Sequence, residues 1–186
     1  MLSESITVFY ITLIFTIKVQ TKREVNIINL ILSIFPNFKL TNKIRGKLFS
    51  PLFKRSGSNL QIASGVIINM HRNISVGDNV YIAHNVWING SGGLEIHDNV
   101  IISPNVIIAT TKHERVNNKV SNTNASVQPI YIGKGCWIAG NSTITMGVSI
   151  ANGCIVSANS LVNKTIKEEN KLIGGVPAKI IKSIGD

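Results

Sequence analysis

The sequence of 186 residues is poor in cysteine and in acidic side chains. Its two cysteines, Cys136 and Cys154, are too few for a disulfide framework and lack the CxxC spacing of a zinc site. We expect both to be free thiols in a reducing compartment. Nine acidic residues stand against 19 lysines and arginines, which gives a formal net charge of +10. This excess favours an acidic partner, such as a phosphorylated cofactor or an anionic membrane surface, or serves solubility alone.

The N-terminus lacks a hydrophobic run long enough to span a bilayer. Residues 5–17 are uncharged and strongly apolar but number only 13, whereas about 18–20 are needed. No basic region precedes them, so we expect no signal peptide. A second apolar stretch, residues 25–35, follows a charged break, and the two stretches are interpreted as a packed helix pair or as segments lying against a membrane. The basic stretch that ends this region favours a solvated helix face.

From residue 60 onward an aliphatic residue recurs every six positions. The ladder shifts by two residues after Ile74 and again after Leu94, and it restarts at Ile132 after a polar interruption. Three positions after most of these aliphatic residues stands glycine or asparagine, the residues that adopt left-handed backbone at least cost. The uninterrupted part of the ladder consists of Ile132, Ile138, Ile144, Ile150, Val156 and Val162.

A six-residue period excludes one face of an α-helix, because six steps of ~100° spread the side chains around the helix. The period fits a short strand followed by a corner, with three such units in one triangular coil. The sequence therefore predicts an all-β solenoid, a parallel β-helix whose coils bury their aliphatic residues against each other. We expect an N-terminal apolar and basic helical or irregular segment over residues 1–58, the β-helix over 59–173 with an inserted loop at 112–129, and a C-terminal cap over 174–186.

Three stretches resemble the hexapeptide-repeat acyltransferases, and most closely their sugar O-acetyltransferase branch. They are residues 96–113 (IHDNVIISPNVIIATTKH), 132–164 (IGKGCWIAGNSTITMGVSIANGCIVSANSLVNK) and 174–184 (GGVPAKIIKSI). The resemblance implies a left-handed parallel β-helix, a homotrimer with active sites between subunits and acetyl-CoA as co-substrate. It implies no metal ion.

The resemblance also implies that His113 is the general base. It follows the last regular strand at the start of the polar interruption, and a histidine titrates near neutral pH. The residues leave its orienting partner open among Glu114, Glu95 and a backbone carbonyl. Donors for the thioester oxyanion are sought at the backbone of Ala139 or Gly140.

By the same resemblance the coenzyme contacts fall on Trp137, Gly140, Ala158 and Lys164, and the basic C-terminal end would meet its phosphates through Lys179 and Lys182. Alternatively, Trp137 packs between subunits, and Lys179 and Lys182 belong to a solvated tail. For the acceptor, Tyr81 matches a tyrosine of the sugar acetyltransferases. Their asparagine position is Ala83 here, with Asn85 two residues further. His84 is interpreted as an exposed turn residue or as part of the acceptor site.

The predicted activity is the transfer of acetyl from acetyl-CoA to a sugar hydroxyl, in a cell-surface polysaccharide such as O-antigen or capsule, or in its precursor. The alternative is N-acetylation of an amino sugar on the same scaffold, and an inactive scaffold protein is a further alternative. A carbonic-anhydrase-type hydratase is disfavoured, since its metal needs closely spaced histidines. We expect a cytoplasmic protein, at the inner face of the membrane if the N-terminus makes peripheral contact there, and no nucleic-acid partner.

Overall fold

The computed structural model describes residues 36–185. Both N-terminal apolar stretches, 5–17 and 25–35, lie outside the described residues, so their two interpretations stay predictions. Within the described range, no helix combines the length and the apolar character that crossing a bilayer requires. Residues from Asn37 onward form one compact unit, and the predicted boundaries at 58 and 173 remain predictions.

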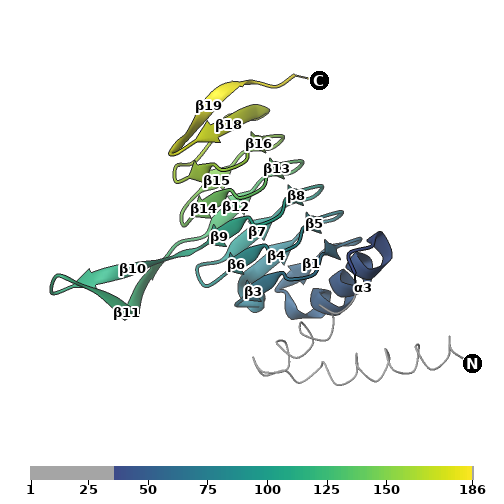
Figure 1. Cartoon of the computed structure of the whole chain (residues 1–186), viewed down its shortest axis with the longest axis horizontal. Helices are drawn as coiled ribbons and strands as arrows, with labels where there is room; N and C mark the ends of the chain where they lie inside the picture. Colours follow the sequence, from purple (N-terminus) through teal and green to yellow (C-terminus); the bar gives the residue numbers. More distant parts are fainter. Residues whose placement is uncertain (1–35, 186) are drawn as a thin grey trace, which may run out of the picture. The chain divides into compact units, whose positions relative to one another are not determined.

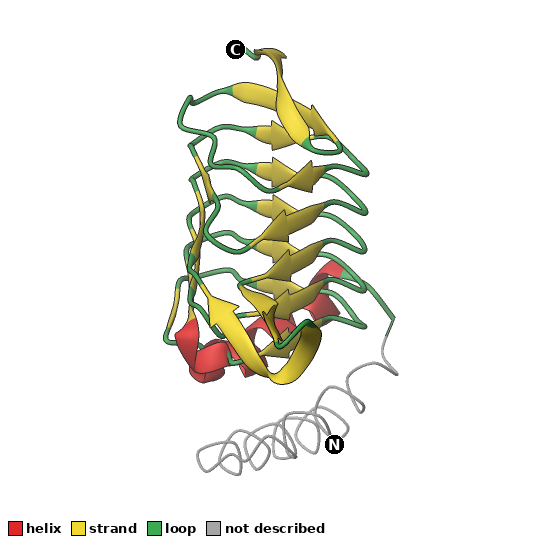
Figure 2. Cartoon of the chain, turned by 90° about the vertical axis from the view of Figure 1, so that its left-hand side faces the viewer, coloured by secondary structure: helices red, strands yellow, loops and turns green. Residues whose placement is uncertain are grey.

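The compact unit is the predicted parallel β-helix, left-handed as the resemblance implied. Short strands on three sides of each coil pair in parallel with the strands of the next coil, so they stack along the solenoid (Figures 1 and 2). Sheet 1 contains β1 (Arg55–Ser56), β4 (Ile74–Val76), β7 (Leu94–Ile96), β12 (Ile130–Ile132) and β15 (Ser149–Ile150). Sheet 2 contains β2 (Gln61–Ile62), β5 (Tyr81–Ile82), β8 (Ile101–Ile102), β13 (Trp137–Ile138), β16 (Ile155–Val156), β18 (Lys171–Gly175) and β19 (Ala178–Ser183). Sheet 3 contains β3 (Ile67–Asn69), β6 (Trp87–Asn89), β9 (Ile107–Ala109), β14 (Thr143–Thr145) and β17 (Leu161–Val162).

Left-handed backbone at the corners explains the recurring glycines and asparagines. Asn85 has φ 58°, Asn141 has φ 59° and Gly135 has φ 68°. Some asparagine side chains also hydrogen-bond from coil to coil, as from Asn79 Nδ2 to Asn99 Oδ1 at 3.2 Å. The corners therefore use residues that reach this conformation cheaply and add contacts between coils.

Coil length explains the two shifts in the aliphatic ladder. In the first coils the paired residues are 20 apart, as in Ile74 with Leu94, whereas further along they are 18 apart, as in Ile132 with Ile150. The two extra residues lie in the turn that leads from sheet 3 to sheet 1, at residues 70–73 and 90–93. We call this side of the triangle the hairpin corner, because the chain leaves the solenoid there.

The core consists of the predicted aliphatic residues, stacked from coil to coil. Ile102, Ile138 and Ile144 are fully buried. Cys136 and Cys154 are buried in the same interior, on adjacent coils, as the ladder predicts.

The N-terminal end of the solenoid is closed by a helix, α3 (Lys39–Phe49), which is followed by a 3₁₀ turn, η1 (Ser50–Leu52). Leu48 and Phe49 are buried beneath the first coil. At Gly46 a Cβ would lie 1.9 Å from the Leu60 carbonyl oxygen, so only glycine allows the helix to approach β2 this closely. A cap of this kind protects the apolar end of a solenoid from solvent.

His71 packs against this cap and is held neutral. It lies in the second 3₁₀ turn, η2 (His71–Asn73), and its ring centroid is 5.9 Å from the rings of Phe49 and of Phe53. Burial in these surroundings lowers the pKa of His71 from 6.5 to about 4. Among the described residues, its buried Nε2 has no hydrogen-bond partner.

This histidine predicts a loss of stability in mild acid. Between about pH 6.5 and pH 4 the unfolded chain binds a proton that the folded chain does not, because burial lowers the pKa of His71 when the chain folds. The melting temperature should therefore fall as the pH is lowered from 6.5 to 5. In His71→Phe, which keeps an aromatic ring at this place, that fall should shrink, while His97→Gln should behave as the parent protein. An unchanged profile in His71→Phe, measured by scanning calorimetry, would contradict the prediction.

Two antiparallel hairpins depart from the regular coils. Strands β10 (Thr111–Val116) and β11 (Lys119–Val127) form an arm that projects from the hairpin corner (Figure 1), so the predicted loop at 112–129 is largely regular structure. At the C-terminus β18 and β19 form a second hairpin that continues sheet 2, with Pro177 in its turn. The arm carries the predicted base His113, and the second hairpin extends sheet 2, where predicted coenzyme residues lie.

Candidate active site

The predicted base, His113, lies on the arm and is exposed. Thr110 anchors the start of the arm, since its buried hydroxyl donates to the Asn89 carbonyl at 2.7 Å and accepts from the Gly92 N–H at 2.8 Å. The two strands pair in register at His113 and Ala125, and the register then shifts before Arg115. The irregularity thus follows directly after the histidine.

The ring of His113 has a fixed partner. Its Nδ1 lies 2.9 Å from the backbone carbonyl oxygen of Ser121, across the arm. A carbonyl oxygen can only accept, so this contact assigns the proton to Nδ1 and leaves the lone pair on Nε2. The orienting partner that the residues left open is therefore a backbone carbonyl in this structure.

The side chain of Ser121 fixes the turn that contains this carbonyl. Glu114, one of the predicted orienting partners, bonds elsewhere. The Ser121 hydroxyl oxygen accepts hydrogen bonds from the N–H groups of Thr123 at 3.2 Å and Asn124 at 2.9 Å, which fixes the local turn. Glu114 instead accepts a hydrogen bond from the Ser126 hydroxyl at 2.6 Å. The other acidic candidate, Glu95, has its oxygen 4.0 Å from His97 on sheet 1. Ser121 lies outside the ladder, and no periodicity of the sequence marks it.

Five of the six predicted coenzyme residues lie on sheet 2 or in the corner next to it. The strand pairing aligns one outward row that includes Trp137 and extends through Leu172 to Lys182 on β19. Gly140 and Ala158 occupy the adjoining corner between sheets 2 and 3, and Lys179 lies on β19 opposite Gly174. The indole N–H of Trp137 donates to the Ser103 hydroxyl at 2.8 Å, a contact that the sequence does not predict.

His113 and Lys164 lie away from this row. Both are at the hairpin corner, which joins sheets 3 and 1, and sheet 2 is the opposite side of the triangular coil. One chain therefore places the proposed base and most of the proposed coenzyme residues on different sides of the same solenoid.

The three predicted acceptor residues lie together on one coil, along and beside β5. Tyr81 is on the outward row of sheet 2, and His84 and Asn85 are exposed in the corner that follows β5. Asn85 is one of the left-handed corner residues, with φ 58°. His84 is thus on a different side of the coil from His113.

The backbone N–H of Ala139 and the thiol of Cys136 both donate to backbone carbonyls within the solenoid. The N–H of Ala139 donates to the Val156 carbonyl at 2.9 Å in the sheet ladder, so it is not available to a thioester oxyanion. Burial raises the pKa of Cys136 to about 11, and its thiol donates to the Ala151 carbonyl at 3.1 Å. A thiol with this pKa is a poor nucleophile at neutral pH. Among the described residues no group of three metal-binding side chains comes together.

The six-residue repeat and the triangular coil define a hexapeptide-repeat solenoid, and comparisons with known proteins refine that class. The structure matches a hexapeptide-repeat acetyltransferase of Vibrio cholerae O1 biovar eltor, solved in complex with acetyl coenzyme A, with a TM-score of 0.71 and 30% identity over 85% of this chain and 86% of that one. It also matches a galactoside acetyltransferase in complex with coenzyme A, with a TM-score of 0.70 and 27% identity over 96% of this chain and 80% of that one. The chain belongs to the family of hexapeptide-repeat acetyltransferases.

A sequence relative agrees with this family. A predicted acetyltransferase of Staphylococcus haemolyticus is 43% identical over 77 residues, which are 41% of this chain. The match spans 40% of that relative's length. No family model matches the sequence.

Proposed function

We propose that this protein transfers acetyl from acetyl-CoA to a hydroxyl group of a sugar. The observation that carries the proposal is the contact between His113 Nδ1 and the Ser121 carbonyl, because it leaves Nε2 able to accept a proton on an exposed arm. The family supports acetyl as the transferred group, since the Vibrio cholerae relative was solved with acetyl coenzyme A.

His113 acts as the general base in the proposed step. Nε2 accepts the hydroxyl proton while the sugar oxygen attacks the thioester carbonyl and forms the new C–O bond. The C–S bond then breaks, and Nε2 gives its proton to the departing sulfur, so coenzyme A leaves as the thiol and the base is regenerated. The Ser121 carbonyl favours this exchange, because it stabilises the imidazolium that forms between the two proton transfers.

The outward row of sheet 2 fits the coenzyme. The row offers apolar and aromatic side chains, among them Ile101, which is 46% exposed, and Trp137, which is 45% exposed. Lys179 and Lys182 add positive charge where the row ends on β19. Apolar contacts suit a pantetheine arm and cations suit phosphates, so one strip of surface offers both kinds of contact.

The active protein is proposed to be a homotrimer. Sheet 2 and sheet 3 expose apolar outward rows, including Ile67 at 52% and Ile107 at 41%, whereas the outward row of sheet 1 contains Arg55, Ser75 and Glu95 before it reaches Tyr131. Apolar outward rows on two sides suit contacts between copies. If sheet 2 of one copy faces the arm of the next, His113 meets the coenzyme row that its own chain cannot offer it.

The acceptor is proposed to be a cell-surface polysaccharide or its precursor, and the setting the cytoplasm, with peripheral contact of the N-terminus at the inner face of the membrane. An experiment with the purified full chain tests the reaction. Radiolabelled acetyl-CoA is incubated with a panel of neutral hexoses, amino sugars and glycosyl phosphates, and the products are separated. We expect labelled ester on hydroxyl acceptors. Amide products alone would favour N-acetylation, and no transfer or hydrolysis with any acceptor would refute the proposal.

A further inference from the structure

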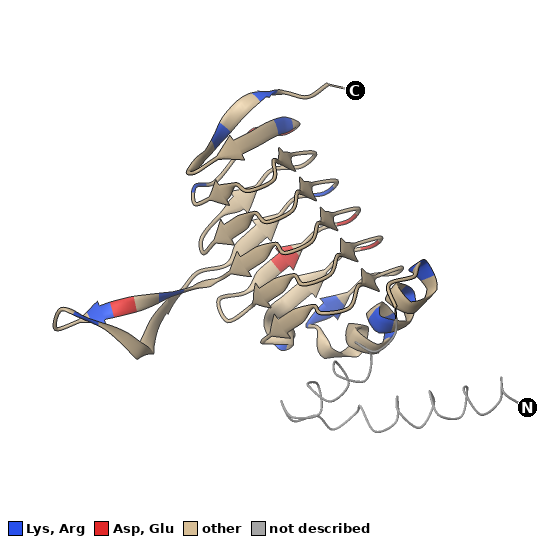
Figure 3. Cartoon of the chain, viewed as in Figure 1, with Lys and Arg blue, Asp and Glu red and all other residues tan. Residues whose placement is uncertain are grey.

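Positive charge is concentrated at the N-terminal end of the solenoid. Residues 25–77 contain seven lysines and arginines and no acidic residue. In Figure 3 many of the lysines and arginines cluster around α3 and the first coils, whereas the aspartates and glutamates lie further along the chain. Asp78 accepts hydrogen bonds from Ser58 on the first coil, but the seven cations outnumber the carboxylates at this end, so its net charge is positive.

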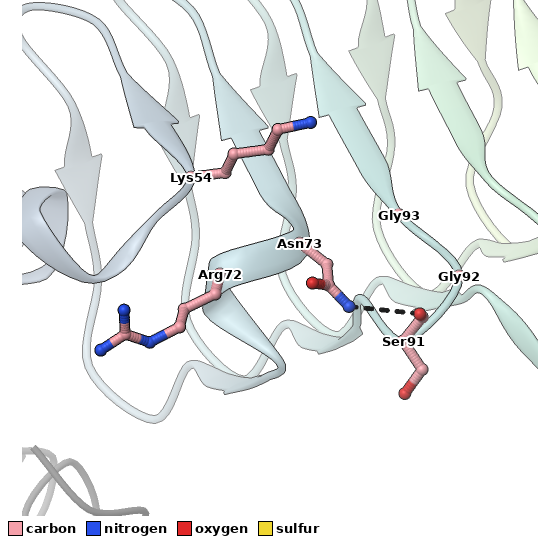
Figure 4. A pocket seen from close by; sticks show the side chains of 6 residues that line it. All are labelled: Lys54, Arg72, Asn73, Ser91, Gly92 and Gly93. Atoms are coloured by element: carbon pink, nitrogen blue, oxygen red, sulfur yellow. Dashed lines mark hydrogen bonds between the residues drawn. The ribbon is translucent and has the colours of Figure 1, made fainter.

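A pocket of about 370 Å³ opens within this basic end. It is built from the two long turns at the hairpin corner, and therefore from the extra residues that lengthen the first coils. Its lining comprises Lys54, Arg72, Asn73, Ser91, Gly92 and Gly93 (Figure 4). At Gly92 a Cβ would lie 2.7 Å from the Gln128 backbone nitrogen, so only glycine lets this turn pack against the base of the arm.

The two cations of the pocket stand on a rigid base. Lys54 follows Phe53 and Arg72 follows His71, and these preceding rings pack together in the cap. The backbone of Lys54 is also fixed, because its N–H donates to the Ile74 carbonyl at 2.9 Å. Neither cationic side chain forms an ion pair in the described part of the chain. In Figure 4 the two side chains leave the ribbon in different directions, so both must turn to meet one anion between them.

The floor of the pocket is tied to the arm that carries His113. The Asn73 amide donates to the Ser91 carbonyl at 3.3 Å and joins the two turns. Gly92 in turn contacts both ends of the arm, at Thr110 and Gln128. From Thr110 to His113 is three residues, or about 10 Å of extended chain. A ligand held in the pocket thus lies beside the base of the arm whose strand β10 carries the proposed base.

We propose that this pocket binds the phosphate group of a phosphorylated acceptor, gripped by Lys54 and Arg72, beside the base of the arm that carries His113. The inference rests on the proposed function only in taking the bound molecule to be the acceptor. The phosphate chemistry is shared by a soluble glycosyl phosphate and by a lipid that carries a sugar through a phosphate, and Arg and Lys recognise both through charged hydrogen bonds.

Binding measurements on the full chain test the pocket without any turnover. Glucose 1-phosphate and glucose serve as probes in equilibrium dialysis, and vesicles of phosphatidylcholine with or without phosphatidylglycerol serve in flotation. We expect Lys54→Gln and Arg72→Gln each to weaken glucose 1-phosphate binding by about fivefold or more. Arg55→Gln is the matched control, because it removes the same charge next to Lys54 from a residue outside the pocket lining. It should change binding by less than about twofold.

The outcomes distinguish a soluble phosphate ligand from a lipid headgroup, and they test the pocket separately from the proposed acetyl transfer. Binding of glucose 1-phosphate with the expected pattern supports a soluble ligand, and the same pattern seen only with anionic vesicles supports a lipid headgroup. Equal binding of glucose and glucose 1-phosphate, equal effects of Arg55→Gln and Lys54→Gln, or no binding of either phosphate probe overturns the inference. Phosphate binding without acetyl transfer would refute the proposed function and leave the pocket standing, whereas transfer without phosphate binding would do the reverse.

Discussion

His113→Ala should lower kcat for acetyl transfer by about 10²–10⁴-fold, the usual contribution of a positioned general base. The KM for acetyl-CoA should stay within about twofold, because the substitution leaves every side chain of the proposed coenzyme row on sheet 2 in place. Steady-state rates of coenzyme A release, measured with a thiol reagent, give both parameters. Folding should be unaffected, since the ring of His113 is exposed on the arm.

His97→Ala provides the matched control for this substitution. His97 is also exposed, and its ring lies 4.0 Å from Glu95 on sheet 1, away from the arm. We expect its kcat to equal that of the parent protein within about twofold. Equal losses in the two variants, or full activity in His113→Ala, would remove His113 from the mechanism.

Ile138→Ala should cost about 2–5 kcal/mol of unfolding free energy, through lost burial and the cavity that it leaves. Ile138 is fully buried in β13, in the middle of the stack. Each coil packs only on its two neighbours, so the cavity weakens both of the coil interfaces that hold β13. Urea unfolding followed by circular dichroism, at one fixed protein concentration, measures the change.

Ile181→Ala removes the same atoms from a side chain that is 59% exposed on β19. Its cost should be below about 1 kcal/mol. A loss in Ile138→Ala no larger than that in Ile181→Ala would show that the stacked interior does not carry the stability of the solenoid.

The solenoid could be predicted from the sequence because every coil has the same structural requirements. The same aliphatic residue must enter the interior at every side of every coil, and the same left-handed corner must follow, so the sequence repeats both requirements in one register. Even the shifts after Ile74 and Leu94 have a structural counterpart in the four-residue turns at 70–73 and 90–93. The interior position of Cys136 and Cys154 follows from their spacing of one coil.

The local geometry of the candidate site was less predictable, since it depends on contacts made once. The carbonyl of Ser121 meets His113 only because the polar segment 112–129 folds into an antiparallel arm. Its residues follow no period, so the sequence does not predict which of them pair. In the same way, the N–H of Ala139 is occupied by the sheet ladder, which a motif cannot show. The pocket next to Lys54 and Arg72 needed the turns of two coils and the cap in place.

The arm also shows where the chain can gain or lose residues without disturbing the stacked coils. It is inserted between β9 and β12, yet β12 pairs with β7 as if the chain had run on directly. The stack therefore does not depend on how many residues leave and return at that corner. Residues can therefore be added to or removed from the arm beyond His113 while the interior and the folding energy that it supplies stay the same.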